Sequence, residues 1–298
     1  MFDYSALSAL SAVVREGSFE RAAQVLNVTP SAVSQRIRAL EERVGCALVE
    51  RAQPCVATDA GRRLCLHVGQ VMLLEQQLRK GMPQLLGGEV SRVAVPVAVN
   101  ADSLATWFTG AVADYAAQSD ALMEVVVDDE GHTADWLRNG KVMAAVTDSA
   151  EPPAGCKCVA LGAMRYIAAA SPTFVRQYFS RGLGAKSLAA APSLAFNNKD
   201  TLQSHWVRRH CRRRVDIPRH LLPSTEAFIT AAQAGMGWGM QPEVLVAPLI
   251  ASGELVPLAD NSYLDVPLYW QVARASTALL TELTTCVKGR ASKSLLSS

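Results

Sequence analysis

The features that direct a chain into or across a membrane are missing from these 298 residues. The first ten residues have neither the basic start nor the apolar stretch of a secretory signal. No run approaches the ~18 consecutive apolar residues that a membrane-spanning helix requires. We therefore expect a protein of the cytoplasm, with no membrane partner.

An excess of one charge is also missing, because 29 Lys and Arg face 27 Asp and Glu, a formal net charge of +2. A strongly basic domain is the usual footprint of nucleic-acid binding, so any DNA site here must be a local face. Aromatic residues contribute only 6%, but half of all residues are apolar, which suffices for a sizeable core. The wealth of Ala and Val suits helices packed on a buried parallel sheet.

The seven cysteines form no regular pattern, and an odd number in a reducing compartment predicts free thiols. Cys156 and Cys158 are close in sequence but lack a second ligand pair at zinc spacing. Metal or redox sensing is therefore a minor alternative, and we expect neither a metal nor a cofactor.

Catalytic motifs are equally scarce. The chain has no Gly-x-Ser-x-Gly, Gly-x-Gly-x-x-Gly, P-loop or His-Glu-x-x-His sequence. The glycines at 235, 237 and 239 lack a phosphate-binding lysine, and their segment predicts a turn and a strand. We therefore do not expect an enzyme.

The first 58 residues predict a winged helix-turn-helix domain. Apolar residues at helical spacing cover 5–14 and 19–26, and Gly17 with Ser18 separates the two helices. Thr29 followed by Pro30 opens a third helix, which Gly45 ends. Two short apolar pieces within 46–57 predict a small β-wing.

A long helix over 59–80 follows, capped by Thr58, with a hinge reaching to residue 88. Its apolar stripe is too long to be buried on a small winged domain, so we expect it to form a dimer. The stripe consists of Leu64, Val68, Val71, Leu74 and Leu78.

Residues 89–298 alternate between strands and helices, which predicts an α/β domain with a parallel sheet. The expected strands are 93–99, 124–127, 142–146, 166–170, 193–196 and 267–273, and the expected helices are 103–117 and 132–139, with others starting near 172, 201, 225 and 277.

The third helix carries two different faces. Val33, Ile37, Leu40 and Val44 form an apolar stripe, while short polar, amide and guanidinium side chains share another face. Such side chains suit the major groove of DNA, where they can bond to base edges. The alternative is an ordinary solvated face, which the preceding short helix and tight turn make less attractive. The residues of this face are Ser31, Ser34, Gln35 and Arg38.

A resemblance to LysR-type transcriptional regulators rests on a long motif with fixed spacings. It comprises Gly17, Ser18 and Phe19, then Ala22, Ala23 and Leu26, residues 29–37, Leu40 and Glu41, residues 45–51, Thr58 and Gly61. Residues 99–107, 19–24 and 224–228 are similar to the branch that regulates export of basic amino acids, the ArgP/LysG-like regulators.

This resemblance implies a mixed fold: an all-α winged helix-turn-helix (1–58), a dimerising linker helix and hinge (59–88), and an α/β periplasmic-binding-protein-like domain (89–298). The last domain would comprise subdomain I (89–163 and 268–298) and subdomain II (164–267), with an effector cleft between them. A homodimer, often a tetramer, would bind double-stranded DNA. The expected DNA contacts are Ser18, Thr29, Ser31, Ala32, Ser34, Gln35 and Arg38, with Arg51 and Gln53 from the wing, which lacks a second basic residue.

Ligands of open α/β sheets bind beyond the carboxyl ends of the strands, where this chain places acids and helix starts. Helix starts can hold a carboxylate, and acids can hold an ammonium or guanidinium group. The alternative is that these acids only cap helices. The candidate effector residues are Asn100, Asp102, Ser103, Asp128, Asp129, Glu130, Thr147, Asp148, Ser224, Thr225 and Glu226.

The densest basic run covers 208–214 and is followed by Arg219 and His220. It lies outside the motif-bearing helices, so a solvated helix face is favoured over a second DNA patch or an anion site.

The resemblance implies a regulator that activates a basic amino-acid exporter gene in response to arginine or lysine. Two alternatives remain open. One is a regulator of the same family with another effector, an organic anion or a redox signal. The other is an architectural or replication-inhibiting DNA-binding protein without a ligand.

Overall fold

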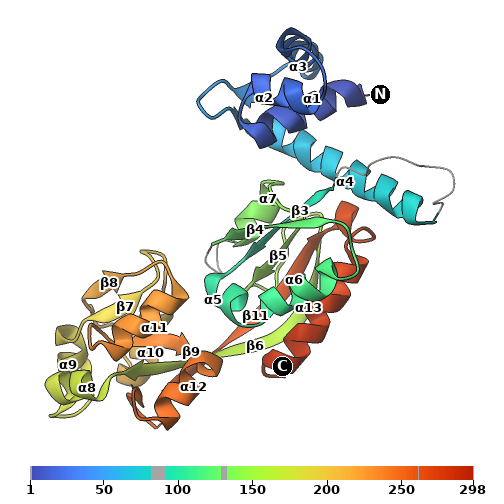
Figure 1. Ribbon diagram of the computed structural model, residues 1–298. Coiled ribbons are helices and arrows are strands. Elements are labelled where there is room, and N and C mark those ends of the chain that lie inside the picture. The colour runs from blue at the N-terminus through green and yellow to red at the C-terminus, as the bar shows by residue number, and fades with distance from the viewer. Residues whose placement is uncertain (1, 82–91, 129–132, 261, 298) are drawn as a thin grey trace.

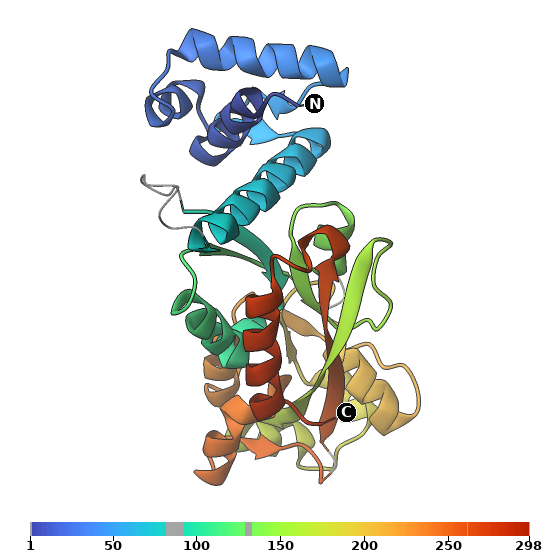
Figure 2. The ribbon, with the colours of Figure 1, turned by 90° about the vertical axis from the view of Figure 1, so that its right-hand side faces the viewer.

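The computed structural model describes residues 2–81, 92–128, 133–260 and 262–297. A small helical domain lies at one end of the long helix α4 (Asp59–Gly81), and two α/β lobes lie at the other (Figure 1). Seen from the side, α4 connects the helical domain to the upper α/β lobe (Figure 2). Within the described residues, no helix combines the length and the apolar character needed to cross a membrane.

The winged domain confirms the three predicted helices and the predicted wing. Each helix begins at a capping side chain, as a short helix with unpaired amide groups requires: Asp3, Ser18 and Thr29. Gly17 and Gly45 adopt left-handed conformations at helix ends. The elements are α1 (Tyr4–Glu16), α2 (Phe19–Val25), α3 (Pro30–Val44), β1 (Val49–Glu50) and β2 (Val56–Ala57).

The core of this domain joins the apolar faces of its helices with the first strand of the wing. Val33, Ile37 and Leu40 of α3 are buried, but Val44 is 38% exposed because it lies in the last turn, beyond the core. The prediction that Val44 belongs to the buried stripe was therefore wrong. Glu41 holds the wing in place, because its Oε1 accepts from the amides of Leu48 (2.8 Å) and Val49 (3.4 Å).

Helix α4 belongs to two cores at once. Val68 is buried in the core of the winged domain, which corrects the assignment of this side chain to a dimer interface. Leu73 is buried in the α/β core, and Gln70 Nε2 donates to Ser276 Oγ at 2.9 Å. Leu74 and Leu78 remain 55% and 56% exposed, so this part of the predicted stripe is available to a partner, and Val71 beside it is half-buried.

The α/β domain contains a mixed seven-stranded sheet rather than the parallel sheet that we expected. β3 runs parallel to β4 and β5, whereas β11 runs antiparallel to β5 and β6. The strands are β3 (Ala94–Val99), β4 (Leu122–Val127), β5 (Ala144–Thr147), β6 (Cys156–Ala170), β9 (Gly239–Pro242), β10 (Val256–Pro257) and β11 (Tyr263–Ala273), in the order β10-β6-β11-β5-β3-β4 with β9 also beside β6.

Two long strands, β6 and β11, pass from one lobe to the other. Ala163 faces Pro267 in their register, and a β-bulge lies directly beside this pair, between Leu268 and Tyr269. Gly162 has φ +127° there, and a Cβ on it would lie 2.5 Å from the carbonyl oxygen of Leu296. The carboxyl-terminal segment is thus bonded at the crossover between the lobes, where Ala163 and Leu296 exchange backbone hydrogen bonds.

Helices cover the sheet within each lobe. The helix expected over 103–117 is interrupted, because a π-helical turn (Leu104–Phe108) separates α5 from α6. Subdomain I contains α5 (Ala101–Ser103), α6 (Thr109–Ala116), α7 (Thr133–Arg138) and α13 (Thr281–Ser294). Subdomain II contains α8 (Pro172–Phe179), α9 (Ala185–Ala190), α10 (Leu202–Cys211), α11 (Thr225–Gln233) and α12 (Glu243–Ala251), with the short parallel strands β7 (Ser193–Ala195) and β8 (Arg219–Leu221).

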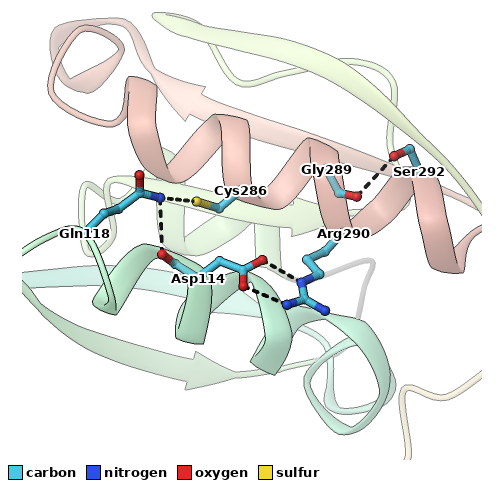
Figure 3. Close-up of polar contacts among 6 residues, drawn as sticks. All are labelled: Asp114, Gln118, Cys286, Gly289, Arg290 and Ser292. Carbon is cyan, nitrogen blue, oxygen red and sulfur yellow. Dashed lines mark hydrogen bonds and ion pairs between the residues drawn. The ribbon is translucent and has the colours of Figure 1, made fainter.

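Helices α6 and α13 pack together through a polar contact (Figure 3). The guanidinium of Arg290 donates twice to Asp114, both bonds being 2.6 Å long, and this pairing lowers the pKa of the Asp114 carboxyl. One turn away, Gln118 Nε2 donates to the Cys286 sulfur at 2.9 Å. These two contacts hold α13 against α6 in subdomain I.

A glycine at the start of α4 makes the joint between wing and linker possible. A Cβ on Gly61 would lie 2.0 Å from the carbonyl oxygen of Leu48, a rigid backbone atom. We expect Gly61→Ala to destabilise the winged domain by about 1–3 kcal/mol, the usual cost of overpacking, as measured by urea unfolding. Gly289→Ala is the matched control, because no atom lies within 4 Å of its Cβ. It should stabilise α13 by about 0.5–1 kcal/mol; equal effects of the two changes would contradict the steric argument.

Candidate DNA-reading helix and effector cleft

Helix α3 presents a polar face to solvent. Ser31, Gln35 and Arg38 are exposed and Ser34 is half-buried, whereas the apolar residues of the same helix lie in the core. The core therefore fixes the orientation of α3 and leaves amide, hydroxyl and guanidinium groups projecting outward. These groups match the donors and acceptors that base edges present in the major groove.

The amino-terminal ends of α2 and α3 are capped by hydroxyl groups. Ser18 Oγ accepts from the amide of Arg21 and donates to Glu20 Oε2, and Thr29 Oγ1 accepts from the amide of Ala32. Ser18 and Thr29 thus have a structural role as caps. The remaining amide groups of these helix starts, with the positive end of the helix dipole, suit DNA phosphates.

The wing lies beside the start of α2. Arg51 places its guanidinium 5.1 Å from the centre of the Phe19 ring, which orients its exposed cation, and Gln53 is exposed. The amide of Cys55 donates to the carbonyl oxygen of Gly17 at 2.9 Å. This bond attaches the wing to the turn between α1 and α2.

A cleft of about 430 Å³ separates the two lobes of the α/β domain. The carboxyl ends of β3, β4, β5 and β7 open onto it, as expected for ligand sites of α/β sheets. Subdomain I contributes Asn100, Ala101, Asp102, Asp128 and Asp148; subdomain II contributes Phe196, Lys199, Asp200, Thr201, Leu202 and His205; the strand β11 contributes Leu264, Asp265, Val266 and Pro267.

The cleft is rich in carboxylates. Asp265 is neutralised by two hydrogen bonds from Arg165, at 2.7 and 2.8 Å, which lower its pKa. The other four carboxylates, of Asp102, Asp128, Asp148 and Asp200, face one ammonium group in the lining, that of Lys199. The lining therefore favours a positively charged ligand.

Two contacts span the cleft and hold the lobes together. Thr225 Oγ1 of subdomain II donates to Asp102 Oδ1 of subdomain I at 2.7 Å. Lys199 Nζ of subdomain II lies 4.0 Å from Asp128 Oδ1, whose other oxygen accepts from Trp136 Nε1 at 3.0 Å. A ligand that competes for these carboxylates would change how the lobes are joined.

A small inner chamber of about 30 Å³ lies beside the cleft. Asp102, Asp200 and Thr225 line it together with Gln241, whose side chain is fully buried. Within the described residues, Gln241 Oε1 has no hydrogen-bond partner, and an orphaned buried acceptor is costly. The chamber thus offers acceptors to a donor group that reaches the back of the cleft.

The structure brings only part of the predicted effector set into this site. Asn100, Asp102, Asp128 and Asp148 line the cleft, and Thr225 lines the inner chamber. Asp129 and Glu130 lie outside the described residues. The other four predicted side chains do not line either cavity: Ser103 is fully buried, Thr147 bonds within its own turn to Ser149, Ser224 caps α11, and Glu226 is exposed.

Sequence reasoning missed the loop after β7, which supplies Lys199, Asp200 and Thr201. The strand-end rule applied to the predicted strand 193–196 would have found it. Asp200 also organises this loop, because its carboxylate accepts from the amides of Phe196 (2.9 Å) and Leu202 (3.1 Å). It therefore caps the start of α10 as well as lining the cleft.

The described residues contain no group of three side chains suited to a metal ion. Burial raises the pKa of the Cys156 thiol and partial burial that of the Cys158 thiol, and burial raises the pKa of Cys65 to about 11. Since the thiolate is the reactive form, these environments disfavour redox chemistry.

An exposed polar helix on a winged domain, joined to a ligand-sized cleft, defines a DNA-binding regulator that responds to a small molecule. Residues 4–62 match the family model "Bacterial regulatory helix-turn-helix protein, lysR family", and residues 92–292 match "LysR substrate binding domain". The chain belongs to the LysR family of bacterial transcriptional regulators.

Relatives and solved structures narrow this assignment. The chain is 46% identical over 288 residues to the HTH-type transcriptional regulator LysG of Mycobacterium tuberculosis, covering 96% of this chain and 92% of that protein. It is 44% identical over 297 residues to ArgP of Pseudomonas aeruginosa, covering 99% and 98%. The crystal structure of ArgP from Mycobacterium tuberculosis superposes with a TM-score of 0.83 at 43% identity, covering 100% of both chains.

Full-length LysG from Corynebacterium glutamicum with bound effector Arg superposes with a TM-score of 0.72 at 36% identity, covering 99% of this chain and 100% of that one. The protein is thus a LysR-type regulator of the LysG/ArgP branch and not an enzyme, which confirms the family and the fold expected from the sequence motif.

Proposed function

We propose that the protein binds arginine or lysine in the cleft and in response activates a gene for a basic amino-acid exporter. The observation that carries this proposal is the excess of carboxylates over ammonium groups in the cleft lining. The bound arginine in the related LysG structure supports the same effector class. A regulator must reach the DNA that it controls, so we propose that the protein acts in the cytoplasm.

The cationic end of the effector requires acceptors, and its α-carboxylate requires donors. The cationic end is held by Asp102, Asp128 and Asp148, with the acceptors of the inner chamber behind them. The α-carboxylate is held by donors, the ammonium of Lys199 and the side-chain amide of Asn100. A neutral isostere of arginine would lose the first set of interactions and keep the second.

The bound effector acts by replacing the contacts that span the cleft. Its cation competes with Lys199 for Asp128 and with Thr225 for Asp102, so the free and bound states join the lobes differently. Such a ligand shifts the conformational equilibrium by its difference in affinity for the two states. The contacts of α4 with subdomain I, through Gln70 and Leu73, transmit the change to the winged domains.

We retain the domain limits 1–58, 59–88 and 89–298, and the division of the last part into subdomain I (89–163 and 268–298) and subdomain II (164–267). The bulge beside the Ala163–Pro267 pair supports that division.

In the DNA complex, Ser34, Gln35 and Arg38 contact base edges. The backbone is held by Ser18, Thr29, Ser31 and Ala32 with Arg51 and Gln53 of the wing.

The reading helix can be tested by single substitutions. We expect Gln35→Ala and Arg38→Ala each to cost about 1–3 kcal/mol of discrimination between specific and random duplex, the value of one good base contact. Fluorescence anisotropy and footprinting at fixed salt measure this. Arg138→Ala removes the same charge from an exposed position on α7 and should change nothing. An unchanged footprint of both α3 variants would exclude α3 as the reader.

The dimer can be tested on the exposed part of α4. We expect Leu74→Glu combined with Leu78→Glu to yield monomers in light scattering, because buried charges oppose an apolar helix contact. Val244→Glu is the control, since Val244 is 61% exposed on α12, far along the chain from α4. A dimer that survives the α4 changes would place the interface elsewhere.

The effector assignment is tested by calorimetry on the full chain. Arginine and lysine should bind, whereas citrulline and norleucine, which lack the side-chain cation, should bind much more weakly. Asp148→Asn should weaken arginine binding roughly fivefold, since a partly exposed ion pair contributes about 1 kcal/mol. Asp120→Asn, an exposed acid outside the cleft, is the matched control.

Equal binding of citrulline and arginine would remove the role given to the carboxylates. Absence of binding by arginine and lysine would refute the effector class, while the DNA-binding function would stand. Arginine binding without any change in promoter occupancy or transcription would refute the response.

A further inference from the structure

Charge is unevenly distributed along the chain. Residues 172–221 contain ten Lys and Arg against two Asp, a net charge of +8, and the other 248 residues contain 19 against 25, a net charge of −6. The winged domain (1–58) carries six Arg and six acids, so it has no net charge. The largest concentration of positive charge in this DNA-binding protein therefore lies outside its reading domain.

The basic segment belongs to subdomain II, and we name its exposed cations the basic lobe. They lie on α8, α9, the end of α10 with the following loop, and β8, all within the lobe that is far from α3 (Figure 1). The eight cations of the basic lobe are all exposed: Arg176, Arg181, Lys186, Arg208, Arg212, Arg213, Arg214 and Arg219.

The cations of the basic lobe are not neutralised by neighbouring carboxylates. In the part of the chain that the structure describes, none of the eight forms an ion pair with a carboxylate. Helix dipoles account for only part of the set: Arg176 and Arg208 lie in the last turns of α8 and α10, where a cation is favourable, whereas Lys186 lies in the first turn of α9, where it is unfavourable. The other two cations of the segment are excluded from the lobe, because Arg209 packs on Tyr263 and Lys199 lines the cleft beside Asp128.

Three of the cations converge on an open basin of about 820 Å³. Arg181 follows α8, Lys186 belongs to α9 and Arg213 follows α10, so three separate elements supply them. The rest of the lining contains Gly182 and Gly184 and uncharged side chains, with no acid. Arginine forks and exposed backbone of this kind suit phosphate oxygens.

We propose that the basic lobe binds the phosphodiester backbone of a second DNA duplex, so that the protein bridges two segments of DNA. An extended polyanion is required, because five of the eight cations lie outside the basin. DNA is the polyanion that this regulator already contacts. The duplex is a second one, because α4 and subdomain I lie between the lobe and α3 (Figures 1 and 2).

The test is capture of a labelled duplex by full-length protein bound to an immobilised duplex, both of random sequence. Arg208→Gln, Arg213→Gln and Arg214→Gln together should reduce capture at least about tenfold. The slope of log K against log salt should fall by up to roughly 0.9 for each phosphate that the variant no longer neutralises. The control combines Lys157→Gln, Lys288→Gln and Lys293→Gln, which removes the same charge from exposed positions of subdomain I and should retain capture.

Equal loss of capture in the two triple variants would show an effect of net charge and overturn the proposal, as would capture unaffected by the lobe substitutions. Stronger capture of single-stranded RNA than of duplex DNA would also overturn it. Circular dichroism and arginine binding of the same variants verify that they are folded. Because arginine binding is measured separately, failure of the bridging proposal leaves the effector assignment untouched.

Discussion

The antiparallel pairing of β6 with β11 is the constraint on which the arrangement of the α/β domain depends. Each strand begins in one lobe and ends in the other, so the two lobes share one sheet and cannot separate. Their register places the bulge and Gly162 at the crossover, where the carboxyl-terminal segment is bonded. The two strands join the lobes on one side of the cleft, and on the other side Thr225 and Lys199 of subdomain II contact Asp102 and Asp128 of subdomain I.

Charges of opposite sign are concentrated in different regions of the molecule, although the net charge of the chain is only +2. Carboxylates gather at the strand ends around the cleft, arginines gather on the distal surface of subdomain II, and the winged domain is neutral. The low net charge follows from cancellation between these regions. A reading domain without net charge gains little from general attraction to phosphates, so its binding would depend more on base contacts, as proposed for α3.

Helix α4 couples the two functions through shared packing. Its first half completes the core of the winged domain, and its second half contributes Leu73 to the core of the α/β domain. A rearrangement of subdomain I therefore moves the helix that carries the reading domain. The exposed Leu74 and Leu78 lie beside this second contact, so a partner helix docked there would be sensitive to the same rearrangement.

The sequence by itself determined the local features: the three capped helices, the polar face of α3, the long linker helix and the family motif. These depend on neighbouring residues, such as Thr29 before Pro30 or the spacing of Val33, Ile37 and Leu40, so periodicity and capping rules suffice. The strand ends 100–102, 128 and 148 were found for the same reason. Tertiary structure alone decided the mixed sheet, because strand partners lie far apart in the chain and pairing direction leaves little mark on composition. It also decided that Thr225 and not Ser224 lines the inner chamber, that Asp200 and Lys199 line the cleft, and that Val68 is internal. Each of these depends on which surfaces meet in the folded chain.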